Sequence, residues 1–278
     1  MNIKQLLEKG INILKENNVE NPIQHSRILL SYVMNKTKEY IVVHDNESVN
    51  KNIEEEYKKC ISELISGMPL QYIINVQEFM KLDFFVNESV LIPRADTEIL
   101  VEEVIRIAKR ENKLKILDLC TGSGAIGISL SKYIENAEII CTDISQKAIE
   151  VANKNKKIHK AEIEILQSNM FENIKNKFDI IVSNPPYISE KVMHTLGKRV
   201  LSEPHIALNG GESGLEFYEI IAENGYKFLN EQGYICVEIG YDQRKSVTEI
   251  FKRYKQYGEI YSKKDFNGLD RIVVVKKG

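Results

Sequence analysis

The chain has 278 residues with a formal net charge of −2, and 43% of its residues are hydrophobic. This length fits one large domain with a smaller one, and the hydrophobic content is enough to bury a real core. A protein dedicated to duplex DNA usually carries a basic balance or a basic stripe, so the charge argues against DNA as the main partner. The composition also excludes disordered, collagen-like and low-complexity chains.

The four cysteines and five histidines indicate neither a disulfide framework nor a metal site. No two cysteines form a CxxC pair, and the histidines are scattered without metal-ligand spacing. Residues 1–15 form a charged amphipathic segment rather than a signal peptide, and no uncharged apolar run approaches the ~20 residues of a membrane span. We therefore expect a soluble, cytoplasmic protein with reduced thiols, no metal and no membrane contact.

The N-terminal part of the chain, residues 2–66, has the pattern of helices. Apolar residues recur at helical spacing within the segments 3–14, 28–33 and 53–65. Asn21 followed by Pro22 is typical of a helix cap with proline in the first turn. The block carries no strand signal and no catalytic constellation. We interpret residues 1–70 as a small helical domain that recognises a partner; a helical bundle without a binding role is the alternative.

The pattern changes at residues 71–92, where apolar and aromatic residues predict two short strands around a turn. We interpret this segment as a β-hairpin that joins two domains. From about Arg94 onward, strand and helix patterns alternate. Strands are predicted at 115–119, 138–142, 162–166, 178–182, 234–239, 259–262 and 271–275, and helices at 125–133, 146–158, 215–229 and 246–254. This alternation predicts a doubly wound α/β domain over residues 93–278, with an antiparallel pair of strands at its last edge.

A glycine-rich loop follows the first strand of the alternating region. Gly122, Gly124 and Gly127 match GxGxxG, which alone is weak evidence for a dinucleotide. Asp118 precedes the loop, where a carboxylate would oppose a pyrophosphate but favour the ammonium group of an amino acid. Asp143 ends the next strand, where an acid commonly binds ribose hydroxyls. Together they predict S-adenosylmethionine as the ligand; a turn without a ligand, and a helix cap at Asp143, are the alternatives.

Four rigid residues, Asn184, Pro185, Pro186 and Tyr187, follow the predicted strand at 178–182, where a doubly wound sheet has its ligand crevice. The prolines lack N–H donors, so the loop presents acceptors. The Asn184 side-chain oxygen and the Pro185 carbonyl can each accept one N–H of an –NH2 group, while Tyr187 can pack its ring against a flat substrate. We predict that these four residues form a catalytic clamp for methylating a planar nitrogen; a proline-stiffened loop without chemistry is the alternative.

In this order the motifs resemble the peptide chain release factor N5-glutamine methyltransferase family (HemK/PrmC type). Four further segments carry the resemblance: 67–73, 91–98, 203–208 and 270–271. The Asn-Pro-Pro-Tyr motif alone is shared with adenine-N6 DNA methyltransferases, whereas the combination is specific. The resemblance implies a Rossmann-like class I S-adenosylmethionine-dependent methyltransferase. Its substrate would be the glutamine in the Gly-Gly-Gln motif of class 1 peptide chain release factors.

The motifs and the resemblance together assign a set of cofactor contacts. They are Asp118, Cys120, Thr121, Gly122, Ser123, Gly124, Asp143, Met170 and Asn184. Three positions depart from the family pattern. Cys120 replaces the first glycine of the usual loop, Ala95 replaces a common proline, and Met170 stands where an aromatic residue often flanks the adenine.

Three rival functions remain open at this point. An adenine-N6 DNA or RNA methyltransferase would use the same clamp on an extruded base, but should also carry a basic recognition surface. A non-catalytic cofactor-binding protein would dock partners through the helical domain, although it would not need the clamp. A nicotinamide oxidoreductase is a distant alternative. We expect a monomer that binds release factors and has no direct contact with nucleic acid.

Overall fold

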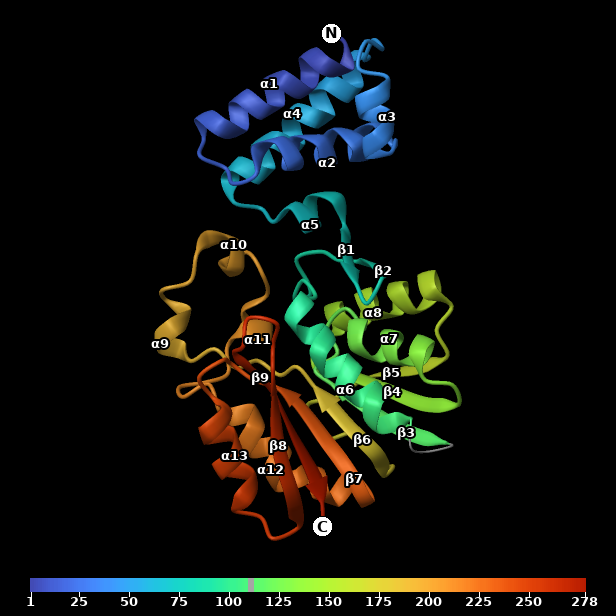
Figure 1. Ribbon diagram of the computed structural model, residues 1–278, viewed down its shortest axis with the longest axis vertical. Helices are drawn as coiled ribbons and strands as arrows, with labels where there is room; N and C mark the ends of the chain where they lie inside the picture. Colours follow the sequence, from blue (N-terminus) through green and yellow to red (C-terminus); the bar gives the residue numbers. More distant parts are fainter. Residues whose placement is uncertain (110–112) are drawn as a thin grey trace. The chain divides into compact units, whose positions relative to one another are not determined.

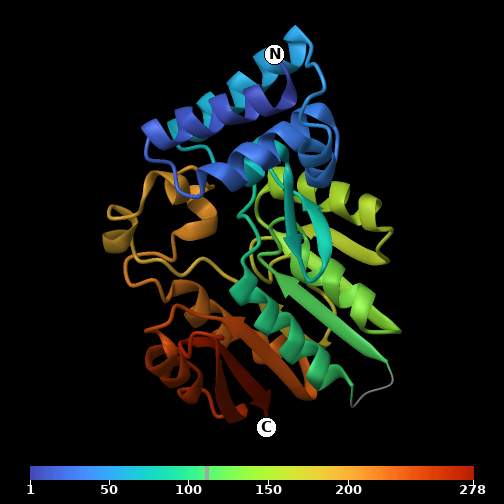
Figure 2. The same cartoon turned by 45° about the horizontal axis from the view of Figure 1, so that its top comes forward.

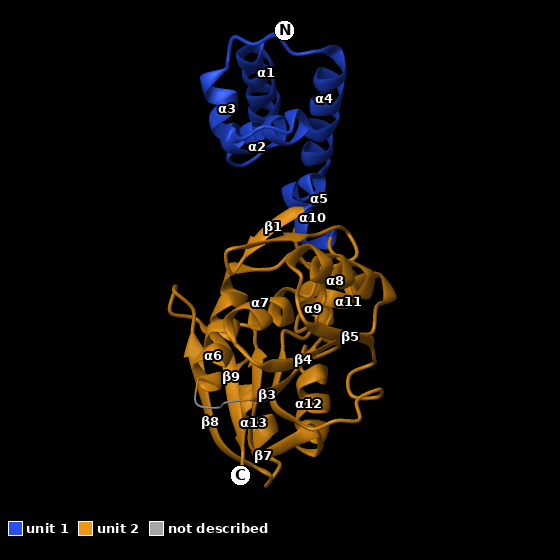
Figure 3. Ribbon diagram, turned by 90° about the vertical axis from the view of Figure 1, so that its right-hand side faces the viewer, with its two compact units in different colours: residues 1–75, 198–202 blue, residues 76–197, 203–278 orange. Residues whose placement is uncertain are grey.

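The chain divides into two compact units, seen in a computed structural model that describes residues 1–109 and 113–278 (Figure 3). The smaller unit, called here the helical unit, comprises residues 1–75 and 198–202. The larger unit comprises residues 76–197 and 203–278. None of the helices within these described ranges combines the length and the apolar character needed to cross a membrane.

The helices of the helical unit are α1 (Ile3–Glu16), α2 (Pro22–Met34), α3 (Lys38–Val43), α4 (Lys51–Ser66), α5 (Leu70–Ile74) and α10 (Lys198–Leu201). Helices α1 to α5 all supply residues of one apolar core. The three predicted helices are present as α1, α2 and α4, whereas α3, α5 and α10 were not predicted. Asn21 occupies the N-cap position of α2 and Pro22 lies in its first turn, as predicted. The backbone of Asn21 is left-handed, with φ of 50°, and its side chain makes no capping hydrogen bond.

Helix α5 corrects the prediction that a strand begins near Tyr72. The amides of Tyr72 and Ile73 both donate to the Pro69 carbonyl, at 3.0 and 3.2 Å, which starts a helical turn. Leu70 and Ile73, three residues apart, are both buried in the helical core. A short apolar run looks the same in a strand and in a buried helix, so spacing alone could not separate them.

A seven-stranded sheet forms the centre of the larger unit, in the order β5-β4-β3-β6-β7-β9-β8. Its strands are β3 (Leu114–Leu119), β4 (Ala137–Asp143), β5 (Ile163–Gln167), β6 (Phe178–Ser183), β7 (Leu229–Glu238), β8 (Tyr257–Lys264) and β9 (Asp270–Lys277). Strands β3 to β7 are parallel, while β9 is antiparallel to both β7 and β8. The predicted antiparallel pair at the last edge is therefore confirmed.

Helices cover both faces of this sheet (Figure 1). The covering helices are α6 (Glu98–Ala108), α7 (Ala125–Tyr133), α8 (Gln146–His159), α12 (Glu216–Phe228) and α13 (Arg244–Lys252). The larger unit also contains the short helices η1 (Ala95–Thr97), α9 (Glu190–Met193) and α11 (His205–Leu208). Alternate strand residues supply two separate cores, as a pleated sheet requires. Ile116 packs with α6 and α7, and its neighbour Leu117 packs with α12 and α13. Helix α6 and the short helices α9 and α11 were not predicted.

The predicted β-hairpin is present as β1 (Val76–Phe79) and β2 (Leu82–Phe85) (Figure 2). Both strands belong to the larger unit. Asn155 of α8 is fully buried and anchors the hairpin. Its amide oxygen accepts from the Phe85 N–H at 2.7 Å, and its amide nitrogen donates to the Phe85 carbonyl and to the Ser123 carbonyl, each at 2.9 Å. One side chain therefore ties β2 to the glycine loop.

We predict that Asn155→Ala destabilises the larger unit because it leaves three backbone groups without their partner. An unsatisfied buried polar group costs about 1–3 kcal/mol, so the free energy of unfolding should fall by about 3 kcal/mol in urea titration. Asn153→Ala is the matched control on the same helix. Its side chain makes one local bond, to the Ile149 carbonyl at 2.9 Å. Equal losses for the two variants would contradict the anchoring role.

Candidate active site

The strand order of the sheet reverses between β3 and β6. These strands are parallel neighbours, yet β4 follows β3 on one side, whereas the chain returns as β6 on the other. In doubly wound sheets ligands bind at the carboxyl ends of the strands at such a reversal. The loop after β3 carries Cys120 to Gly124, and the loop after β6 carries Asn184 to Tyr187. The topology therefore brings the two predicted motifs side by side.

A cavity of about 170 Å³ lies between these loops. Among the predicted site residues, its walls include Cys120, Thr121, Gly122, Ser123, Asp143, Met170, Asn184 and Pro186. Unpredicted wall residues include Phe79, Arg94, Thr97, Ile126, Ala148, Pro204, Ile206 and Ala207. Four predicted site residues lie outside the walls: Asp118, Gly124, Pro185 and Tyr187. Across residues 1–109 and 113–278, no cluster of three or more His, Cys, Asp or Glu side chains could hold a metal ion.

Asp118 lies beneath the glycine loop rather than in the cavity. One carboxylate oxygen accepts from the Thr121 hydroxyl at 2.5 Å and from the Gly127 N–H at 3.1 Å. The other oxygen is buried and has no protein partner among the described residues. Burial raises the pKa of Asp118 to about 7, although both hydrogen bonds oppose the rise. Asp118 does not line the cavity and braces the loop against α7. The contact of its carboxylate with a ligand ammonium stays a prediction.

The loop geometry explains two of its glycines. Gly122 has φ of 54°, in the left-handed region, and its α-carbon faces open space in the cavity. A β-carbon on Gly127 would lie 2.2 Å from the Cys141 sulfur, so only glycine lets α7 pack this closely on β4. Cys120 has a left-handed backbone too, with φ of 59°, and a β-carbon is strained there. Its sulfur lies 3.8 Å from that of Met170.

Asp143 faces the cavity from the end of β4. Its Oδ2 accepts from the Gly122 N–H and its Oδ1 accepts from the Ser145 N–H, each at 2.9 Å. The cap of α8 is Ser145, whose hydroxyl accepts from the Ala148 N–H at 3.3 Å. A helix cap at Asp143 is therefore excluded. Burial raises the pKa of Asp143, and the backbone donors of Ser145 and Gly122 oppose that rise.

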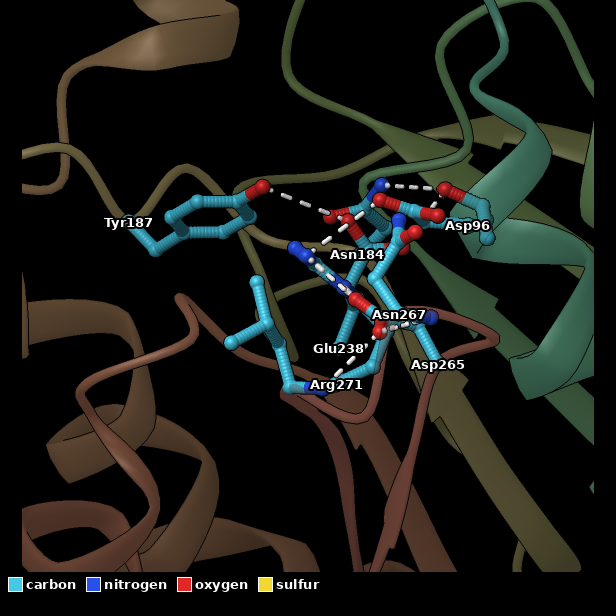
Figure 4. A network of polar contacts seen from close by, with 9 residues as sticks. Asp96, Asn184, Tyr187, Glu238, Asp265, Asn267 and Arg271 are labelled. Carbon is cyan, nitrogen blue, oxygen red and sulfur yellow. Dashed lines mark hydrogen bonds and ion pairs between the residues drawn. The ribbon is translucent and has the colours of Figure 1, made fainter.

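A chain of polar contacts fixes the loop after β6 (Figure 4). The Asn184 amide nitrogen donates to the Thr97 hydroxyl oxygen at 3.2 Å, and the Thr97 hydroxyl donates to Glu238 at 2.5 Å. The Tyr187 hydroxyl donates to the other Glu238 oxygen at 3.3 Å. Sequence reasoning missed Thr97 and Glu238, because their positions are 141 residues apart. The only signal was that Thr97 lies in a segment carrying the family resemblance.

A second loop, residues 208–210, packs against the loop that carries the clamp. The Ile188 N–H donates to the Leu208 carbonyl at 3.0 Å, and the Gly210 N–H donates to the Ile188 carbonyl at 2.8 Å. The Gln243 amide donates to the Tyr187 carbonyl at 3.0 Å. A β-carbon on Gly210 would lie 2.7 Å from the Tyr187 α-carbon, so this position requires glycine.

Glu203 connects two further segments that carry the resemblance. Its buried carboxylate accepts from the Ile92 N–H at 3.0 Å and forms an ion pair with Arg94. Arg94 lines the cavity, and so does Pro204, the residue after Glu203. Glu203 therefore holds the segments 91–98 and 203–208 together at the cavity wall.

Comparison with known proteins identifies the family. Two family models match, the PrmC N-terminal domain over residues 5–74 and the methyltransferase small domain over residues 95–235. A release factor glutamine methyltransferase of Clostridium acetobutylicum is 41% identical over 284 residues, covering 100% of this chain and 99% of that protein. This chain belongs to the release factor glutamine methyltransferase family. Another member, from Clostridium botulinum, is 38% identical and matches over 100% of both chains.

Solved structures agree on the fold of the larger unit. A Thermus thermophilus 16S rRNA methyltransferase, solved in complex with AdoMet and guanosine, superimposes with a TM-score of 0.52 at 14% identity. The match covers 73% of this chain and 50% of that chain. The predicted class I methyltransferase fold is confirmed, and the chain is an S-adenosylmethionine-dependent methyltransferase by family.

We predict that Gly210→Ala lowers methyl transfer by displacing the clamp loop without closing the cavity. A shift of about 1 Å in a catalytic group can cost about 100-fold, so the rate at saturating substrate should fall at least about 10-fold. Cofactor affinity, measured by calorimetry, should stay within about twofold, because Gly210 does not line the cavity. Gly197→Ala is the control, since no atom lies within 4 Å of its added β-carbon. A fully active Gly210→Ala enzyme would refute the supporting role of the second loop.

Proposed function

We propose that this protein transfers a methyl group from S-adenosylmethionine to the side-chain amide nitrogen (N5) of the glutamine in the Gly-Gly-Gln motif of class 1 peptide chain release factors. One observation carries the proposal. The Asn184 amide is held by Thr97 in the wall of the same cavity that contains the glycine loop and Asp143. The protein would act as a cytoplasmic monomer without direct contact with nucleic acid.

The cavity residues fit the parts of S-adenosylmethionine. Asp143 offers carboxylate oxygens to ribose hydroxyls from the end of β4, where acids commonly bind ribose. Ile126, Ala148 and Met170 supply apolar walls for a flat base. Gly122 leaves open space beside its α-carbon, which allows the cofactor to approach the backbone closely. We assign Asp118, Cys120, Thr121, Gly122, Ser123, Gly124, Asp143, Met170 and Asn184 to cofactor binding. Asp118 also supports the loop through its bond to the Gly127 N–H.

The clamp orients the substrate amide. The Asn184 amide nitrogen is committed to Thr97, and no protein atom among the described residues is recorded as a donor to its oxygen. That oxygen belongs to a residue of the cavity wall and can accept one N–H of a glutamine amide. We assign the other N–H to the carbonyl of Pro185, which lies between the wall residues Asn184 and Pro186. Pro186 and Tyr187 keep the loop rigid, since proline fixes φ and the Tyr187 hydroxyl is bonded to Glu238.

Alignment is the main chemical contribution of these residues. S-adenosylmethionine supplies an electrophilic sulfonium methyl group and leaves as a neutral thioether. An amide nitrogen is a poor nucleophile because its lone pair is delocalised, and holding both N–H bonds favours pyramidal geometry as the new N–C bond forms. Good alignment can contribute about 7–11 kcal/mol. The methylated nitrogen is cationic until it loses a proton, and the two acceptors stabilise that charge.

Two substitutions should separate the role of the clamp in methyl transfer from the role of Asp143 in cofactor binding. Asn184→Ala removes an acceptor from the clamp, so turnover should fall by roughly 10²–10³ while cofactor binding survives.

Asp143→Ala removes the ribose partner, so affinity for S-adenosylmethionine and S-adenosylhomocysteine should fall alike, by about 1.5–3 kcal/mol. The measurements are calorimetric affinity and transfer of labelled methyl to release factor, with single-stranded DNA as a second acceptor. Transfer to DNA and none to release factor would overturn the proposed function.

We also propose that the helical unit binds the body of the release factor. A single glutamine offers few atoms, so the clamp alone cannot select it among exposed glutamines. The helical unit has a groove between α2 and α3, lined by exposed Ile23, Val42 and Val43 and by the basic side chains Arg27 and Lys38. Exposed apolar surface with a charged rim is typical of a protein interaction site.

We predict that replacing both Val42 and Val43 by Glu weakens methylation of intact release factor but not of a short Gly-Gly-Gln peptide. The two side chains are 55% and 74% exposed, so the folded unit should tolerate the change. The measurement is the ratio of kcat/KM for protein and peptide, expected to fall at least about 10-fold. Ile158→Glu on α8, where the side chain is 52% exposed, is the control. An unchanged ratio would mean that this groove does not bind the release factor.

A further inference from the structure

The proposed role of Asn184 requires its side-chain amide to lie in one of two possible orientations, and the residues of the clamp do not by themselves fix which one. An asparagine amide has an acceptor end and a donor end of nearly the same shape. Only the oxygen of Asn184 can accept a substrate N–H. A 180° rotation of the amide would present a donor to the substrate and repel its N–H groups. Something in the protein must therefore distinguish the two ends of Asn184.

Glu238 supplies the distinction through Thr97. An ionised carboxylate can only accept hydrogen bonds, so the Thr97 hydroxyl must donate its single proton to Glu238, over 2.5 Å. The Thr97 oxygen then has only lone pairs left for Asn184, 3.2 Å away. The Asn184 amide must face Thr97 with its nitrogen, which leaves its oxygen available to the substrate.

We propose that Glu238, acting through Thr97, is the positioning residue that fixes the amide orientation of Asn184. This inference rests on the proposed function of the clamp. Glu238 also accepts the Tyr187 hydroxyl, so one carboxylate sets both ends of the motif. Glu238 itself is 1% exposed and does not line the cavity, whereas Thr97 does. Glu238 therefore acts on the substrate only through its neighbours.

The surroundings of Glu238 keep its charge finely balanced. Arg271 of β9 favours the charged form, and Asp96 of η1 opposes it. Arg271 is itself shared between Asp265 at 2.9 Å and Asp96 at 3.2 Å (Figure 4). Tyr218 is a further titratable neighbour, and its hydroxyl donates to the Glu238 backbone carbonyl at 2.8 Å.

The balance has a consequence near neutral pH. Burial raises the pKa of Glu238 to about 7, against the opposing effects of Thr97, Arg271 and Tyr187. Above this pH the carboxylate is ionised and Asn184 is held in the productive orientation. Below it the protonated carboxyl group can donate to Thr97, which frees the Thr97 hydroxyl to donate to Asn184 and reverse the amide. The transfer rate should therefore fall as the pH drops through about 7.

The hydrogen-bonded series from Glu238 through Thr97 to Asn184 is called the relay here. Three variants test it: Thr97→Val, Thr97→Ser and Glu238→Gln. Valine keeps the shape of threonine but removes the hydroxyl, so kcat should fall roughly 10–100-fold. Serine restores the hydroxyl and should recover most of the rate. Glutamine cannot ionise and accepts either hydrogen-bond direction, so Glu238→Gln should lower kcat at pH 8 and lose the fall in rate toward pH 6. Cofactor affinity should stay near the wild-type value in all three.

The outcomes separate the relay from the proposed function. If Thr97→Val transfers methyl groups as fast as Thr97→Ser, or if Glu238→Gln keeps the full rate and the acid limb, the relay is overturned. If the wild-type enzyme transfers no methyl to release factor, the proposed function fails. The relay is then decided by NMR exchange of the Asn184 side-chain amide protons. They should be protected in the wild-type enzyme and Thr97→Ser and exposed in Thr97→Val, and equal protection in all three would overturn it.

Discussion

The candidate active site depends on the pairing of β3 with β6 at their carboxyl ends. The last residue of each strand, Leu119 and Ser183, are register partners, and the Ser183 hydroxyl donates to the Leu119 carbonyl at 2.8 Å. The next residue along β3 is Cys120, and the next along β6 is Asn184. The glycine loop and the Asn-Pro-Pro-Tyr loop therefore leave the sheet from one paired position. A shift of one residue in this register would turn every side chain of a strand to the opposite face.

Buried polar side chains perform the fine positioning that this pairing cannot. Asp118 braces the glycine loop, Asn155 connects it to the hairpin, and Glu238 orders the clamp. Each of these side chains bonds to a group in another segment of the chain, at a place that the backbone hydrogen bonds of the sheet do not reach. Removing such groups from water is costly unless they are paired, and this cost makes their arrangement specific. The same cost raises the pKa values of Asp118 and Glu238 to about 7, because burial disfavours the charged form of each carboxyl group.

Periodicity and turn chemistry could predict most of the framework. The strands and long helices from Leu114 onward lie within a few residues of their predicted positions, except that β7 begins five residues earlier than predicted, at Leu229 rather than Tyr234. The apolar run 72–74 was misassigned because a five-residue helix and a strand bury the same residues. The two loop motifs were found because each is contiguous and follows a predicted strand. Thr97 and Glu238 could not be found this way, since their meeting is a property of the folded sheet. The left-handed backbone of Cys120 gave no signal in the residue itself; the only hint was the glycine that the family pattern has at this position.

The position of β9 has a consequence for the order in which the fold is completed. This strand comes last along the described chain, yet it lies between β7 and β8 instead of at an edge. Until residues 270–277 have left the ribosome, β7 exposes an unpaired edge and β8 has no neighbour in the sheet. Such an edge invites pairing with other chains. Arg271, which faces Glu238 and Asp96, is delivered by the same strand. Closing the sheet and completing the charge balance around the clamp therefore both wait for the strand of this sheet that is synthesised last.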